Sequence, residues 1–195
     1  MKPTVQRERV LLYNLPASID KGARIRRILV GLGIQIIDIT PDKLAQTLGY
    51  CAGISGYGPS GQSYEGEPFS EDVMILAALS DEKINQLLAQ IRKSGAGSVS
   101  LMAVVTEHNR SWPLARLFAE LRSERQVMAA WISLQQSVKM AEALEASGAR
   151  PAAGSGSPGM TFESALATAR GVLQSEEPPD VTAIRQADLD LKAFL

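Results

Sequence analysis

Six aromatic and polar side chains offer the best candidates for ligand chemistry in this chain. Three lie in a glycine-rich stretch, and three follow an apolar segment near the middle of the sequence. Aromatic rings with a few polar groups on a glycine-rich loop can form a ligand pocket or a docking surface. A disordered loop beside a capped helix is the alternative. The candidate binding residues are Tyr50, Tyr57, Tyr64, His108, Asn109 and Trp112.

The only histidine, His108, could act as a general base with Glu107 beside it. A solvent-facing or helix-capping histidine explains the same residue without any reaction. The only cysteine, Cys51, is expected to be a small buried hydrophobe. Paired carboxylates, an activated nucleophile and a metal-ligand cluster are all missing from the sequence pattern. The sequence therefore favours a protein that is not an enzyme, with no catalytic residue, metal site or cofactor.

Nucleotide and RNA binding are not expected either. The stretch Gly56-Tyr-Gly58-Pro-Ser-Gly61 matches G-x-G-x-x-G, but it contains a proline and does not directly follow a strand. The predicted strand 99–105 has no aromatic or basic residue, so the sheet lacks a base-stacking surface for nucleic acid. Lys21, Arg24 and Arg27 could hold phosphate or an acidic partner, or could form an ordinary solvated face. A formal net charge of −1 gives the protein no overall attraction for nucleic acid or other anionic partners.

Two strand–helix–strand units of similar design must position these groups. Residues 9–15 and 34–39 flank the first helix, and residues 72–79 and 99–105 flank the second. We expect an α+β fold of the ferredoxin-like β-α-β-β-α-β type, with a four-stranded antiparallel sheet and strands one and three at its centre. The competing arrangement is a doubly wound parallel sheet, with residues 40–70 as a crossover. The ferredoxin-like form would bring the tyrosine loop close to His108.

Strands three and four are apolar on both faces, whereas a strand with one wet face should alternate apolar and polar residues. The two predicted helices can cover only one face. A long helix predicted over residues 112–147, or a second subunit, must cover the other. The apolar stripe of that helix is expected to comprise Leu114, Leu117, Leu121, Met128, Trp131 and Val138.

The chain divides into four predicted parts. Residues 1–125 form the α+β domain, and residues 126–148 extend its long helix. Residues 149–160 are a flexible linker by composition, and residues 161–195 form an amphipathic helical tail.

Several short motifs between Arg9 and about Arg125 resemble a small bacterial family known only as a domain of unknown function. The motifs are Val10-Leu-Leu-Tyr-Asn-Leu15, Arg24-Ile-Arg-Arg-Ile-Leu29, Leu32-Gly33-Ile34, Leu48-Gly-Tyr-Cys-Ala-Gly53, and Thr106 to Trp112 with Leu117 and Glu120-Leu121. The resemblance implies a cytosolic bacterial protein without a known activity.

The leading interpretation is an interaction or scaffold module that works by protein–protein association, with a partner or with itself as a homodimer. Its amphipathic tail would present a recognition helix after a flexible tether. The alternative is a small-molecule-binding regulatory domain that uses the glycine- and tyrosine-rich loop 49–70. The chain shows no signal sequence and no apolar run of about 18 residues, so a cytoplasmic location without membrane contact is expected.

Overall fold

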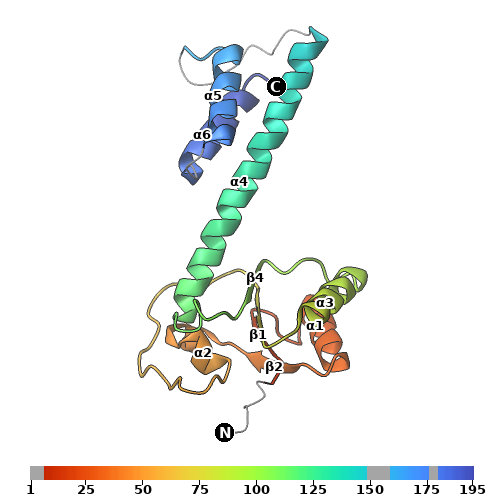
Figure 1. Cartoon of the computed structure of the whole chain (residues 1–195), viewed down its shortest axis with the longest axis vertical. Coiled ribbons are helices and arrows are strands. Elements are labelled where there is room, and N and C mark those ends of the chain that lie inside the picture. Colours follow the sequence, from red (N-terminus) through yellow and green to blue (C-terminus); the bar gives the residue numbers. More distant parts are fainter. Residues whose placement is uncertain (1–6, 149–158, 176–179) are drawn as a thin grey trace. The chain divides into compact units, whose positions relative to one another are not determined.

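The computed structural model describes residues 7–148, 159–175 and 180–195. It forms two compact units, with unit 1 ending at Arg122 and unit 2 running from Ser123 to Leu195. Most of the predicted linker 149–160 lies outside the described residues. Figure 1 shows the elements of both units.

Unit 1 is built on a four-stranded sheet with the order β2-β1-β3-β4. The two central strands, β1 and β3, are antiparallel, and each pairs in parallel with the edge strand of its own β-α-β unit. The central register places Arg9 opposite Ala77 and Tyr13 opposite Val73. The strands are β1 (Arg9–Tyr13), β2 (Gln35–Asp38), β3 (Val73–Ala77) and β4 (Leu101–Val104).

This topology corrects the predicted antiparallel sheet. The α+β class and the central position of strands one and three are confirmed, but the sheet is mixed. In the ferredoxin-like topology a strand of the other unit separates the two strands of each β-α-β unit. Here the two strands of each unit are direct neighbours. The sheet also differs from an all-parallel one, because its two central strands are antiparallel. Both topologies bury the same two central strands, so a burial pattern in the sequence does not separate them.

The helices α1 (Asp20–Gly31) and α3 (Asp81–Lys93) pack together on one face of this sheet. Ile25 and Leu29 of α1 and Leu87 and Ile91 of α3 are buried against the strands. The Ser80 hydroxyl accepts a hydrogen bond from the Lys83 amide at 3.3 Å, which caps the start of α3.

The second face is covered by the chain itself, as the apolar strands required. It packs against the 3₁₀ turn Pro41–Ala45, the short helix α2 (Leu48–Cys51), the segment around Phe69 and the first turns of α4 (Leu114–Ser147). Leu114 and Phe118 of α4 are fully buried there. The beginning of the long helix is therefore one of the segments that cover this face.

Unit 2 combines the remainder of α4 with α5 (Phe162–Gln174) and α6 (Val181–Lys192). The three helices share an apolar core that includes Leu134, Leu166 and Ile184. A single stripe along α4 was predicted to continue through Met128, and this is wrong because 60% of Met128 is exposed. The buried positions of α4 in unit 2 are Ala130, Leu134, Ser137, Val138 and Ala141.

A polar cluster lies inside the core of unit 2. The Asp188 carboxylate accepts hydrogen bonds from the hydroxyls of Ser133 (2.7 Å) and Ser137 (2.6 Å), and from the Lys192 ammonium (2.8 Å). Burial opposes the charge of Asp188, but these donors outweigh it and hold the pKa of the carboxyl below its ordinary value. The cluster thus joins α6 to α4 through side-chain hydrogen bonds. Among the described helices, none has the length and apolar character needed to cross a membrane.

Candidate functional site

Unit 1 contains a cavity of about 720 Å3 at one edge of the sheet. By edge we mean an end of the sheet at which strands begin or finish, not an outermost strand. We call this one the second edge, because β3 and β4 of the second β-α-β unit finish there. The strand β1 begins at the same edge, since it is antiparallel to β3. The residues that line the cavity are Arg7, Arg9, Ala52, Gly53, Ile54, Ser55, Ala77, Ala78, Leu79, Val104 and Val105.

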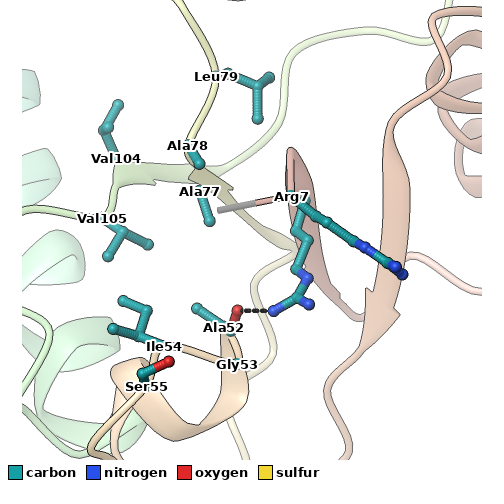
Figure 2. A pocket seen from close by; sticks show the side chains of 11 residues that line it. Arg7, Ala52, Gly53, Ile54, Ser55, Ala77, Ala78, Leu79, Val104 and Val105 are labelled. Atoms are coloured by element: carbon teal, nitrogen blue, oxygen red, sulfur yellow. Dashed lines mark hydrogen bonds between the residues drawn. The ribbon is translucent and has the colours of Figure 1, made fainter. Parts of the chain in front are cut away.

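The fold explains why a hollow forms at this place. After β3 the chain turns through Ala78 and Leu79 into α3, and after β4 it leaves through Val105. In open α/β sheets the connections diverge from the carboxyl ends of parallel strands, and ligands bind in the crevice that results. The segment that follows α2, from Ala52 to Ser55, forms another wall (Figure 2).

Arg9 is the charged group fixed most firmly in the cavity wall. Its Nη1 donates a hydrogen bond to the carbonyl oxygen of Ala52, and its Nε donates to Oε1 of Gln35 at 3.1 Å. The guanidinium lies directly over Gly53, where any β-carbon would collide with it. Gly53 also has a φ of +67°, which favours glycine. The dashed line at the Ala52 carbonyl oxygen in Figure 2 marks the hydrogen bond that this oxygen accepts from Arg9.

Ala78 contributes an unusual backbone to the same cavity. Its φ is +58°, in the left-handed region that costs an alanine about 1–2 kcal/mol. Only one other non-glycine residue in the described part of the chain, Asn14, has a positive φ. Non-glycine residues with a left-handed backbone cluster at functional sites, so Ala78 makes this cavity a candidate functional site.

The rest of the lining is mainly apolar. Val104 on the edge strand β4 is 44% exposed, and Ile54 and Val105 also line the cavity. Among the described residues that line the cavity, none carries a carboxylate, an imidazole or a thiol. Arg7 and Arg9 therefore give the lining a positive charge.

At the first edge, contacts of the chain cover the ends of β1 and β2, while a hollow of about 330 Å3 lies beside the start of β4. Asn14 follows β1 with a φ of +53°, and its amide donates to the carbonyl oxygens of Phe69 at 2.7 Å and Glu71 at 3.0 Å. The guanidinium of Arg122 lies 4.4 Å from the centre of the Phe69 ring and pairs with the Glu71 carboxylate. The segment that leads into β3 thus closes this edge over the end of β1.

Glu71 takes part in this closure as an ion. Partial burial disfavours its charge, but the hydrogen bonds and charge of Arg122 outweigh this, and the pKa of Glu71 lies below its ordinary value. The neighbouring Asp72 behaves alike, because Lys21 and Ser100 donate to its carboxylate and keep its pKa low despite burial.

None of the six sequence-predicted site residues lines the cavity. Four of them lie on α2 or on the turn after β4, and backbone hydrogen bonds join these two segments, from Leu48 to Trp112 (2.9 Å) and from Gly49 to Arg110 (2.7 Å). Tyr50 is 39% exposed on α2. His108 meets the ring of Trp112 edge-on at 5.0 Å.

The remaining predicted residues have local structural contacts. Asn109 caps its own turn, accepting from the Thr106 amide and donating to the Val104 carbonyl oxygen. Tyr57 packs its ring against Gly49, and a β-carbon at Gly49 would lie 2.6 Å from that ring. Tyr64 stacks on Phe69 with ring centres 6.5 Å apart.

Sequence reasoning missed the cavity because its lining consists mostly of small apolar residues and two arginines. The usable signal was topological: Ala78 and Val105 each follow a strand of the same β-α-β unit. The thiol of Cys51 lies outside the cavity lining, and burial raises its pKa despite the charge of Lys43. No group of three or more His, Cys, Asp or Glu side chains in the described ranges is placed to hold a metal ion.

Comparison with known proteins adds a partial match. No curated protein and no solved structure matches the chain. Residues 72–128 match a family model described as a domain of unknown function, DUF3783. The matched segment holds β3, α3, β4 and the beginning of α4, and with them five cavity residues from Ala77 to Val105. Over this segment the chain is therefore similar to a family of unknown function.

Proposed function

We propose that unit 1 is a binding module for a small molecule, which occupies the cavity at the second edge. The observation that carries this proposal is the cavity itself. Its volume of about 720 Å3 lies within the range of roughly 300–1,000 Å3 typical of ligand pockets. Its position at the carboxyl ends of β3 and β4 is where open α/β sheets bind ligands.

The backbone of Ala78 supports the same conclusion. A turn with a purely structural role would be more stable with glycine at a φ of +58°. The chain instead keeps a methyl group in the cavity wall, at an expense of about 1–2 kcal/mol. A methyl group that shapes a binding surface accounts for this choice.

The lining favours binding over catalysis. Ser55 is its one hydroxyl side chain, and no imidazole or carboxylate among the described lining residues could activate it. The arginines can hold a ligand through their N–H donors.

A thermal-shift screen of small metabolites, followed by NMR mapping of each hit, tests the proposal. The cavity-blocking variant is Val104→Trp, because Val104 lies in the wall on an edge strand and is 44% exposed. The matched control is Ile19→Trp. Ile19 is also β-branched and 43% exposed, but it lies next to α1 at the first edge.

We expect at least one compound to stabilise the wild type and Ile19→Trp but not Val104→Trp. Amide shifts should concentrate at Gly53, Ala78 and Val105. If no compound stabilises the wild type, or if Val104→Trp binds a hit as well as the control does, the proposal is wrong.

Association with a protein is a second candidate function, favoured by unit 2. Met128 (60% exposed) and Ile132 (47% exposed) lie one helical turn apart on α4, where they form an apolar pair in water. Light scattering of the wild type and of a Met128→Glu, Ile132→Glu variant tests self-association. We expect a mass above the 20.9 kDa monomer for the wild type only. A monomeric wild type removes homodimerisation.

A further inference from the structure

We propose that the cavity ligand is a small organic anion, a carboxylate or phosphate with an apolar body, and that Arg9 binds its charged group. This inference rests on the proposed function, since it requires that the cavity holds a ligand. It adds the chemical class of the ligand and the residue that selects it.

The first argument is that Arg9 is held in place before any ligand arrives. Gln35 and the Ala52 carbonyl oxygen orient its guanidinium, and Gly53 allows it to lie flat against the backbone. A guanidinium has more N–H donors than these two acceptors use, and its fork matches the oxygens of carboxylate and phosphate groups. Because the side chain is already ordered, an anion would bind it with little further loss of entropy.

The second argument is that the charge of Arg9 is not neutralised nearby. Glu8 is the adjacent acid in the chain, but its carboxylate pairs with Lys83 of α3. The described lining residues include no carboxylate, whereas Arg7 adds a second positive charge at the rim. An anionic group is therefore the natural counterpart of this lining.

The third argument concerns the remaining volume. The rest of the lining includes the methyl group of Ala78 and the side chains of Ile54, Val104 and Val105. These groups offer no side-chain hydrogen bond to a polar ligand. A compact aliphatic or aromatic body attached to the anion fits both parts of the cavity.

Matched acid and amide probes test the inference without knowledge of the natural ligand. Benzoate and isobutyrate are titrated at low ionic strength against benzamide and isobutyramide, with the amides of Gly53, Ala78 and Val105 followed by NMR. Phenyl phosphate joins the series to separate carboxylate from phosphate. The proteins are the full-length wild type, Arg9→Gln, Val104→Trp and the control Arg27→Gln, which changes an exposed arginine of α1.

We expect the acids to bind the wild type and Arg27→Gln about tenfold or more tightly than the amides, since a charged hydrogen bond exceeds a neutral one by at least that factor. Arg9→Gln should lose this preference but still bind the amides. Val104→Trp should bind neither. If Arg9→Gln does not fold, Arg9→Lys replaces it; it keeps the charge without the fork and should retain only part of the preference.

Salt provides a measurement that needs no variant. In the wild type, 500 mM NaCl should weaken binding of the acids but not of the amides. Equal affinity of acids and amides, with both lost in Val104→Trp, would overturn the anion inference and leave the proposed function standing. An acid preference that survives in Arg9→Gln would overturn the role of Arg9. Probes that leave the cavity amides unmoved would overturn both proposals.

Discussion

Asn14 follows β1 and Ala78 follows β3, and the two residues share a left-handed backbone with φ values of +53° and +58°. Their surroundings differ. The amide of Asn14 donates hydrogen bonds to the carbonyl oxygens of Phe69 and Glu71, and these contacts cover the end of β1. Ala78 lines a cavity of about 720 Å3 at the second edge.

The difference follows from the direction of the central strands. Because β3 is antiparallel to β1, the segment that leads into β3 arrives at the first edge, where Phe69 and Glu71 fill the space. The second edge receives the start of β1 and the chain leaving β3 and β4, but no strand of the described sheet is entered there from a long connection. The ends of β1 and β2 are thus covered, whereas the ends of β3 and β4 line a cavity.

The largest expected effect is a difference in the free energy of unfolding when side chains are truncated at the two edges. Phe69→Ala should lower the free energy of unfolding by about 3–5 kcal/mol, since the ring packs against Phe118 and Arg122 in a closed edge. Val104→Ala at the open edge should change it by only about 0.5 kcal/mol. Urea denaturation measures both. Similar losses at the two positions would remove the distinction between a closed and an open edge.

A second prediction concerns the glycine beneath Arg9. Gly53→Ala should destabilise unit 1 by about 1–2 kcal/mol, because alanine is strained at a positive φ and its methyl group displaces the guanidinium. Gly58→Ala is the matched control in the same loop, since a β-carbon there meets nothing and its φ is ordinary. Thermal unfolding of the two variants should differ clearly. Equal melting temperatures would contradict the role assigned to Gly53.

Glycine substitution at the two left-handed residues should change the free energy of unfolding in opposite directions. Asn14→Gly should destabilise by about 1 kcal/mol, because two hydrogen bonds that close the first edge are lost. Ala78→Gly should stabilise by up to about 1 kcal/mol, because it relieves strain at a residue that holds no such bond. Denaturant midpoints measure the pair. A loss of stability in Ala78→Gly would show that its methyl group packs, as at the closed edge.

The smallest effect is the pH dependence of the closed edge. The pKa of Glu71 is lowered in the folded protein, so its contribution to stability is present above the ordinary value of 4.5 and is lost as the pH falls below it. Glu71→Gln should therefore be less stable than the wild type at pH 7, and the gap should narrow in acid. Asp72 keeps its own acid sensitivity in this variant. A gap that stays constant with pH would contradict the ion pair with Arg122.

The sequence was sufficient for the elements of unit 1 but not for the pairing of its strands. Apolar residues on both faces of β3 correctly required a covered second face, which Leu114 and Phe118 of α4 supply. The partner of each edge strand depends on how its crossover packs. Both arrangements bury β1 and β3 equally, so Val10 to Tyr13 and Val73 to Ala77 carry no information that separates them.

The cavity was harder to predict because its key features are contacts rather than residue types. In the sequence, Arg9 resembles any arginine at the start of a strand. Its special place depends on contact with Gly53, which lies more than forty positions later in the chain. Ala78 gives no sign of its positive φ, since alanine rarely adopts it. The tyrosines were predicted as binding residues because their rings can contact a ligand. In the structure, Tyr57 packs against Gly49 and Tyr64 stacks on Phe69.

The burial of Phe118 against Tyr13 also sets an order of events during synthesis. The helix α1 and strand β2 can join β1 soon after they emerge from the ribosome, because all three are close in sequence. The cover of the face that carries Leu11, Tyr13 and Ile75 is complete only after residue 118 has been made. A growing chain of about a hundred residues would therefore expose that face, which makes it a target for chaperones and a risk for aggregation.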